Sequence, residues 1–295
     1  MKKFLAKVLF YGFVYVLVFN IIAVICLFSL QKSNFYKPEF LKNGVKETNF
    51  DYVVLGSSTG LTTLNTIAID SILNKKGLNI SMDDSSISSH YLMLQHFFAL
   101  KKKTKILILT VSQWDLINKK PELNNNDYRF LPFVYEKYIY DYYSEMETSF
   151  FKPLTLSRYL PVVGVSYYNT ELFYPSILTA IYPTKRNRFD EKGNYFYPGE
   201  GSPTEQKYLS IKLEINNPYL SKIARLCQEN QVELIVYIPP NYKTTITTNQ
   251  KLNIVNHSDL IKDKKLFYDN IHVNESGRKK CSIEFAKVLN TNFQH

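Results

Sequence analysis

Residues 51–60, DYVVLGSSTG, decide the fold class, because an apolar run of strand length ends there in a Gly-Ser-Ser turn. A short apolar run without polar alternation predicts a strand that is buried on both faces, as in a parallel sheet. Residues 63–75 then have the pattern of a helix, so the segment predicts a strand–turn–helix unit. Ser58 on such a turn is expected to expose its hydroxyl beside the free N–H groups of a helix start.

The same alternation continues through much of the chain and predicts an α/β domain with a parallel sheet covered on both faces. Asn217-Pro218 predicts a helix start, because Asn caps a helix and Pro suits its first turn. The alternation stops over residues 116–205, where aromatic residues gather, and this region predicts an insertion with a hairpin at 188–197. The other expected elements are strands at 78–82, 104–111, 232–238 and 252–255, and helices at 88–101, 217–229 and 275–289.

The N-terminal segment predicts the compartment. Residues 8–30 form an uncharged apolar stretch of about 23 residues, enough to cross a hydrocarbon core of about 30 Å as a helix. Lys2, Lys3 and Lys7 precede it, so the positive-inside rule places the N-terminus in the cytoplasm. The stretch is too long for a signal peptide and lacks a small-residue cleavage site. We therefore expect a cytoplasmic tip and single-pass anchor over 1–32, a polar stem over 33–50 and a domain over 51–292. The anchor would lie in the cytoplasmic or inner membrane, and the domain would lie on its extracytoplasmic side.

Composition narrows the partners of that domain. The chain of 295 residues has a formal net charge of +10 and is 45% hydrophobic, so it can bury a core and attract anionic partners. No zinc-knuckle, helix-turn-helix or Gly/Arg-rich pattern supports nucleic acid, and the expected location argues against cytosolic cofactors. We expect no nucleic-acid partner, no cofactor and no metal. The 23 Tyr and 20 Phe suit an aromatic core, a binding groove or a surface close to lipid.

A second motif, Asp269-Asn270-Ile271-His272, lies just before the closing helix. A serine nucleophile needs a general base, and the base needs a carboxylate that fixes its tautomer. Asp and His three residues apart meet on one turn, so a single loop delivers both. Each motif alone also fits an ordinary helix start with a capping side chain. Together they predict a catalytic triad of Ser58, Asp269 and His272.

The two motifs carry a resemblance to the SGNH/GDSL hydrolase superfamily. Residues 266–289, LFYDNIHVNESGRKKCSIEFAKVL, resemble its last block, and residues 51–60 resemble its first block. In the first block Ser58 stands at the nucleophile position and Ser57 where Asp is common. The resemblance covers roughly 51–115 and 205–292, and it implies a flavodoxin-like three-layer fold.

The second and third blocks, which supply oxyanion-hole donors in the superfamily, depart from its pattern in this chain. The second-block glycine, an oxyanion donor in the superfamily, corresponds to the neighbourhood of Asp84 and Ser85. The third block, Gly-x-Asn-Asp, appears as residues 112–115, SQWD, so Gln113 or the Trp114 indole would replace the Asn donor. VSQWDL resembles the Ser-Pro-Gln-Trp segment of the D-alanine transfer protein-like members, which are membrane-anchored and handle acyl groups on cell-envelope polymers.

The resemblance implies a membrane-anchored serine esterase or O-acyltransferase that modifies cell-envelope polysaccharide. Its expected partners are an acylated glycan or lipid-linked substrate, the membrane and a membrane acyl-donor protein. A non-catalytic glycan-binding or assembly protein on a degenerate SGNH scaffold stays open, as does a plain lipase. Residues 56–60 also satisfy Gly-x-Ser-x-Gly of the α/β-hydrolase fold, in which several strands normally precede the nucleophile.

Overall fold

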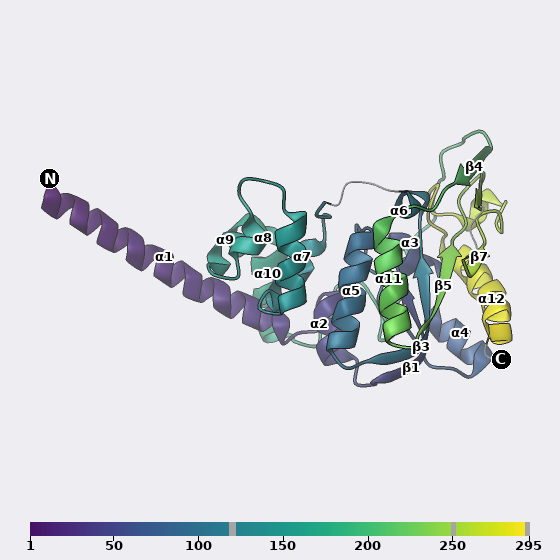
Figure 1. Cartoon of the computed structure of the whole chain (residues 1–295), viewed down its shortest axis with the longest axis horizontal. Helices are drawn as coiled ribbons and strands as arrows, with labels where there is room; N and C mark the ends of the chain where they lie inside the picture. Colours follow the sequence, from purple (N-terminus) through teal and green to yellow (C-terminus); the bar gives the residue numbers. More distant parts are fainter. Residues whose placement is uncertain (118–121, 249–251, 293–295) are drawn as a thin grey trace. The chain divides into compact units, whose positions relative to one another are not determined.

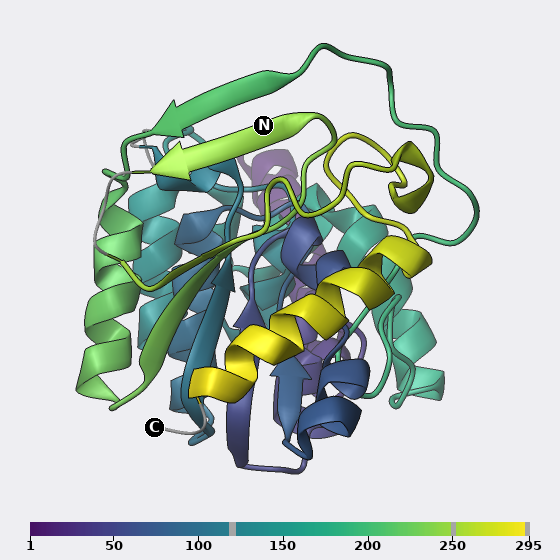
Figure 2. The same cartoon turned by 90° about the vertical axis from the view of Figure 1, so that its right-hand side faces the viewer.

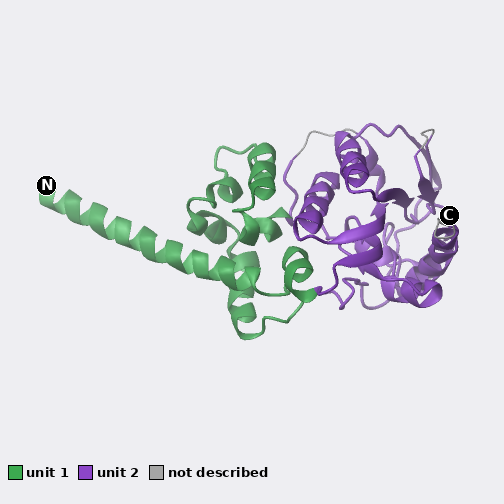
Figure 3. Ribbon diagram, turned by 60° about the horizontal axis from the view of Figure 1, so that its bottom comes forward, with its two compact units in different colours: residues 1–44, 127–187 green, residues 45–126, 188–295 purple. Residues whose placement is uncertain are grey.

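The computed structural model describes residues 1–117, 122–248 and 252–292. The chain forms two compact units (Figure 3). The smaller unit contains Met1–Gly44 and Asp127–Asn187, and the larger unit contains Val45–Asn126 and Arg188–His295. Each unit is therefore built from segments that are far apart in the sequence.

A five-stranded parallel sheet forms the centre of the larger unit, in the order β2-β1-β3-β5-β7. The register places Val54 of β1 beside Ile108 of β3, and Ile108 beside Ile235 of β5. All three side chains are fully buried, as expected for strands with both faces covered. The strands are β1 (Asn49–Leu55), β2 (Gly77–Asn79), β3 (Lys103–Thr110), β5 (Glu233–Ile238) and β7 (Ile254–Asn256).

Helices cover both faces of this sheet (Figures 1 and 2). α4 (Thr66–Leu73) and α12 (Glu275–Asn292) pack together on one face, and α5 (Ile87–Ala99) and α11 (Pro218–Glu229) pack together on the other. The short helices are α3 (Ser58–Thr63), α6 (Gln113–Leu116) and the 3-10 helix η3 (Lys264–Leu266). A mixed α/β fold with a parallel central sheet is thus confirmed.

Two local features of the larger unit differ from the sequence-based expectation. Residues 188–197 contain no strand; the Asp190 carboxylate accepts hydrogen bonds from the backbone N–H groups of Lys192 and Asn194, so the segment folds as a side-chain-closed turn. A second, two-stranded parallel sheet pairs β4 (Leu209–Leu213) with β6 (Thr244–Thr248), and the sequence did not predict it.

The smaller unit is helical. It contains α1 (Lys2–Gln31), α2 (Lys37–Glu39), the π-helix η1 (Phe40–Gly44), the 3-10 helix η2 (Asp127–Phe133), α7 (Lys137–Met146), α8 (Pro153–Leu156), α9 (Pro161–Tyr167) and α10 (Asn169–Ile181). α1 is long and apolar enough to cross a membrane.

Residues 33–50 do not form the expected polar stem. Phe35, Tyr36, Phe40 and Leu41 are buried in the smaller unit, and β1 already begins at Asn49. The expected insertion at 116–205 is also divided differently. Residues 127–187 pack with the N-terminal 44 residues, whereas 188–205 belong to the larger unit, and 118–121 lie outside the described residues. Aromatic side chains spread over both segments explain why the boundary was not visible in the sequence.

Candidate active site

Ser58 is the first residue of α3, directly after the turn that ends β1. Ser57 is the extended N-cap residue, and its carbonyl accepts from the backbone N–H of Leu61. Gly56 is required in this turn, because a Cβ there would lie 2.7 Å from the carbonyl oxygen of Thr110 at the end of β3. The turn therefore lies against the carboxyl end of the neighbouring strand, where parallel sheets gather their functional groups.

Asn79 supports this turn from the end of β2. Its side-chain amide donates to the carbonyl of Gly60 at 3.0 Å, and its side-chain oxygen accepts from the backbone N–H of Ser81. Asn79 is fully buried. The turn that carries Ser58 is thus fixed by contacts to both strands that flank β1.

His272 and Asp269 lie on the loop between η3 and α12. One oxygen of the Asp269 carboxylate accepts from the backbone N–H groups of Ile271 and His272, each at 2.8 Å. Its other oxygen is 2.8 Å from Nδ1 of His272. The loop therefore closes around the carboxylate, which holds the imidazole in one orientation.

Nε2 of His272 lies 2.8 Å from Oγ of Ser58. A carboxylate only accepts hydrogen bonds, so Nδ1 of His272 carries the proton that Asp269 accepts. In the neutral imidazole Nε2 is then the acceptor, and the Ser58 hydroxyl donates to it. The three residues expected to form a triad are therefore brought into one hydrogen-bonded chain.

The charge of Asp269 is stabilised at this site. Partial burial alone would raise the pKa of the carboxyl, but the hydrogen bonds from the His272 ring and from the Ile271 N–H hold it below its ordinary value. Asp269 therefore stays ionised at neutral pH. His272 is buried, whereas the Asp269 side chain is about half exposed.

Two tyrosines that the sequence did not point to stand beside the histidine. The Tyr197 ring stacks on Tyr268 at a centroid distance of 4.6 Å and meets the His272 ring edge-on at 5.0 Å. Burial first, and then the nearby carboxylates of Asp83 and Asp269, raise the pKa of Tyr197 to about 12. Tyr197 is therefore a neutral phenol over the physiological range, and it narrows the space around the imidazole.

The other predicted site residues follow the carboxyl ends of β2 and β3. Asp84 is exposed and has a positive φ of 47°, a conformation that favours glycine. The Ser85 hydroxyl donates to the Met82 carbonyl and lies 3.3 Å from Nε2 of the buried His90. Among the described residues, neither side chain is hydrogen-bonded to Ser58.

Gln113 and Trp114 open the short helix α6 after β3. Ser112 caps this helix, and its backbone N–H and hydroxyl both donate to the buried Asp115 carboxylate, at 2.9 and 2.7 Å. The Asp115 carboxylate therefore stabilises the turn that begins α6. Trp114 is 59% exposed and Gln113 is partly buried.

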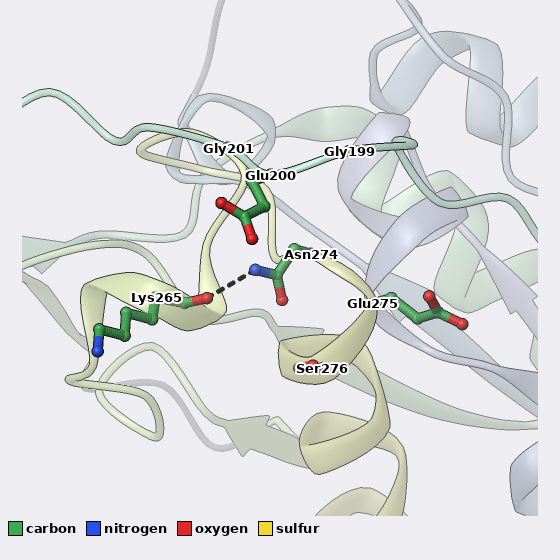
Figure 4. Close-up of a pocket in the computed structure, with 7 residues that line it drawn as sticks. All are labelled: Gly199, Glu200, Gly201, Lys265, Asn274, Glu275 and Ser276. Carbon is green, nitrogen blue, oxygen red and sulfur yellow. Dashed lines mark hydrogen bonds between the residues drawn. The ribbon is translucent and has the colours of Figure 1, made fainter.

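A pocket of about 520 Å³ lies next to the histidine loop (Figure 4). Two of its lining residues are joined by a hydrogen bond, in which the side-chain amide of Asn274 donates to the Lys265 carbonyl at 2.7 Å. No triad residue lines it. Its lining residues are Gly199, Glu200, Gly201, Lys265, Asn274, Glu275 and Ser276.

The Ser–His–Asp chain has the connectivity that activates a hydroxyl for acyl transfer. Among the described residues, no group of three or more His, Cys, Asp or Glu side chains is placed to hold a metal ion. Comparison of the chain with models of known families and with curated proteins finds no match. The geometry of the site is therefore the basis for a functional proposal.

Proposed function

We propose that this chain is a membrane-anchored serine esterase or O-acyltransferase of the SGNH type, with Ser58 as nucleophile, His272 as general base and Asp269 as its orienting carboxylate. One observation carries the proposal. The two contacts Ser58 Oγ to His272 Nε2 and His272 Nδ1 to Asp269 Oδ2, both 2.8 Å, join residues from opposite ends of the domain. A buried histidine held by a carboxylate and aimed at a serine on a strand–helix turn is an arrangement suited to nucleophilic catalysis.

The sheet supports the SGNH assignment over the α/β-hydrolase alternative. Numbered within the sheet, its strand order is 2-1-3-4-5, the flavodoxin-like order. Ser58 follows the first strand of this sheet, whereas several strands precede the nucleophile in α/β-hydrolases. The positive φ of Asp84 also supports the resemblance, because the superfamily has a glycine in this block.

In the proposed reaction His272 Nε2 takes the Ser58 hydroxyl proton while Oγ attacks the acyl carbonyl carbon. The tetrahedral oxyanion accepts from the Ser58 backbone N–H, one of the first N–H groups of α3 that have no acceptor within the helix. Collapse breaks the ester bond, and the leaving alcohol takes the proton from His272. Water or a sugar hydroxyl then gives its proton to His272, attacks the acyl-Ser58 and releases the serine, which gives hydrolysis or transfer respectively.

The substrate class follows from the anchor, the charge and the rings near His272. An anchored basic domain outside the cytoplasmic membrane would meet acylated envelope glycans and lipid-linked precursors, many of them anionic. Tyr197 and Tyr268 offer aromatic surface on which a sugar ring could pack. A membrane acyl-donor protein would supply the acyl group in the transferase reaction.

A fluorophosphonate probe tests the nucleophile. Full-length chain in detergent is expected to be labelled, and Ser58→Ala is expected to abolish labelling. Ser221→Ala, which removes an exposed serine on α11, is the matched control and should label like the wild type. Equal labelling of Ser58→Ala and wild type would contradict the proposal.

A glycan-binding protein on a degenerate scaffold is the second candidate, favoured by the exposed Trp114 and by Gln113 at the position of the superfamily Asn. It predicts no labelling of the wild type and retained binding of envelope oligosaccharide. Among enzymes, a comparison of acyl release with acyl transfer to an added oligosaccharide separates an esterase from a transferase. Turnover of long-chain esters without any glycan acceptor would indicate a plain lipase.

A further inference from the structure

The C-terminal half of α1 has a protein-facing side as well as an exposed side. Ala23, Cys26, Leu27 and Leu30 are buried and recur at helical spacing, because this face packs against α9 and α10 of the same unit (Figure 1). Ile21, Ile25 and Phe28 on the remaining surface are exposed. A span surrounded only by lipid would have no buried face, so α9 and α10 accompany part of the span itself.

A hydrogen bond shows how far along α1 the start of α9 lies. The side-chain oxygen of Asn20 accepts from the backbone N–H of Val162 in the first turn of α9, at 3.2 Å. At 1.5 Å per residue, Asn20 lies about 20 Å along α1 from Lys7, the last lysine before the apolar stretch. A hydrocarbon core is about 30 Å thick, so the start of α9 lies inside it.

The polar groups of this region are satisfied by neighbouring helices, as lipid requires. The Ser29 hydroxyl donates to the Ser176 carbonyl of α10 at 2.9 Å. Pro175 within α10 removes the N–H that would bond the carbonyl of Glu171, and the Tyr36 hydroxyl donates to that carbonyl at 2.6 Å instead. Both polar interruptions of the apolar stretch, Asn20 and Ser29, are thus used to join α1 to α9 and α10.

The exposed side chains of these helices are mostly apolar, with Ser166, Asn169 and Thr170 as the exposed polar residues. No charged side chain occurs between residues 172 and 184. α7 of the same unit contrasts with this, because Lys137, Asp141 and Glu145 recur on one exposed or partly exposed side. The exposed apolar side chains from α8 to α10 are Leu156, Tyr159, Leu160, Tyr167, Phe173, Tyr174, Ile177 and Ile181.

Aromatic and basic residues mark the end of this apolar surface. Tyr182 is exposed directly after α10, and exposed Lys185 follows it. A backbone hydrogen bond from the Asn34 N–H to the Pro183 carbonyl places this segment beside the end of α1, where Lys32 is exposed. Tyrosine is enriched at the headgroup level of membranes, and lysine there attracts anionic lipid. The end of the apolar surface is therefore suited to the headgroup region.

We propose that α8, α9 and α10 are immersed in the outer leaflet of the membrane that α1 crosses, so that the smaller unit is a membrane-embedded platform rather than an aqueous domain. The occupant of its apolar surface is the phospholipid acyl chain, because this surface is continuous with the exposed face of α1. The proposal rests on the membrane anchor in the proposed function and is independent of the triad.

Quenching of a single tryptophan by brominated lipid tests the platform. The chain has one tryptophan, Trp114, so Trp114→Phe provides a background in full-length protein reconstituted into phosphatidylcholine–phosphatidylglycerol vesicles. Leu160→Trp and Ile177→Trp, at positions 44% and 50% exposed, report on the platform. Tyr11→Trp reports on the anchor, and Lys137→Trp on the charged side of α7 is the matched control.

Emission at positions 160 and 177 is expected to fall by an amount comparable to that at position 11 and several-fold more than at position 137. Quenching at 11 without quenching at 160 and 177 would overturn the platform and leave the anchor intact. The same result would point to a second membrane protein as the partner, since only lipid is present in the vesicles. Absence of quenching at position 11 as well would overturn the anchor and the platform together.

Discussion

Asp269 holds His272 both through its ring and through the backbone. One carboxylate oxygen accepts from two backbone N–H groups of the loop, and the other accepts from the ring. The residue therefore sets the loop conformation and the imidazole tautomer together. A substitution that keeps the first role and loses the second separates the two contributions.

Asp269→Asn is such a substitution. Its amide oxygen can still accept from the Ile271 and His272 N–H groups, so its amide N–H₂ faces Nδ1 of His272 and forces the proton onto Nε2. A histidine in that tautomer cannot accept the Ser58 proton, and kcat for an activated ester is expected to fall by roughly 10⁴-fold. Asp263→Asn, which changes the cap of η3 in the same region, is the control and should retain activity. A loss of less than about tenfold would indicate that Asp269 does not set the tautomer.

The same carboxylate predicts a pH dependence of stability. The pKa of Asp269 is lower in the folded chain than its unfolded value of about 3.9. The stabilisation it provides is therefore complete above that unfolded value and is lost as the pH falls through the folded pKa. Thermal unfolding of wild type and Asp269→Asn should show a Tm difference that is steady from about pH 5 upward and shrinks below about pH 4. A difference that grew on acidification would contradict the assigned direction.

At the scale of elements, α11 illustrates a helix whose start is set by one residue. The Asn217 side-chain oxygen accepts from the Tyr219 N–H, and its amide donates to the Ile117 carbonyl, each at 3.0 Å. The cap thus also ties the helix to the segment that follows α6. Asn217 is buried, so both contacts are protected from water.

Asn217→Ala is expected to destabilise the larger unit by about 1–2 kcal/mol, because it removes the cap and leaves the partly buried Ile117 carbonyl without its donor. Chemical or thermal unfolding followed by circular dichroism measures this loss. Gln228→Ala at an exposed position of the same helix is the control and should change stability by less than about 0.5 kcal/mol. Equal effects of the two substitutions would show that the cap contributes nothing.

The elements that the sequence predicted well are those with local signals. β1, β3 and β5 are continuous apolar runs, and α11 begins where Asn-Pro predicts. β6, with the sequence TTITT, has no such signal and forms a strand only because β4 pairs with it. The hydrogen-bonded group of Ser58, His272 and Asp269 was predictable because the serine turn and the Asp-x-x-His motif are each local. Tyr197 was not, since its position beside Tyr268 and His272 depends on the path of the chain between α10 and β4.

At the scale of the whole molecule, the division into two units depends on long-range pairing that no local pattern encodes. Residues 1–44 contact 127–187, and the sequence signal of an apolar N-terminus does not predict what packs against it. The anchor and the aromatic region were expected as separate features. In the structure, α1 and residues 127–187 of the aromatic region belong to one unit.

The proposed orientation of the chain across a membrane can be tested with added cysteines. The three native cysteines, Cys26, Cys227 and Cys281, are buried and unpaired, so a membrane-impermeant maleimide should react with them little. Ile72→Cys, at an exposed position on α4, is expected to react in intact cells, and Lys3→Cys only after lysis. The reverse pattern would place the larger unit in the cytoplasm.

The distance along the chain between Ser58 and His272 has a consequence for biosynthesis. The two side chains are 214 residues apart in sequence, and the later one belongs to the loop just before the last helix. A nascent chain that has not yet produced the loop before α12 cannot bring them together. In the proposed enzyme, the Ser58 hydroxyl therefore acquires its base only after the 214 residues that lead to His272 have been synthesised and folded.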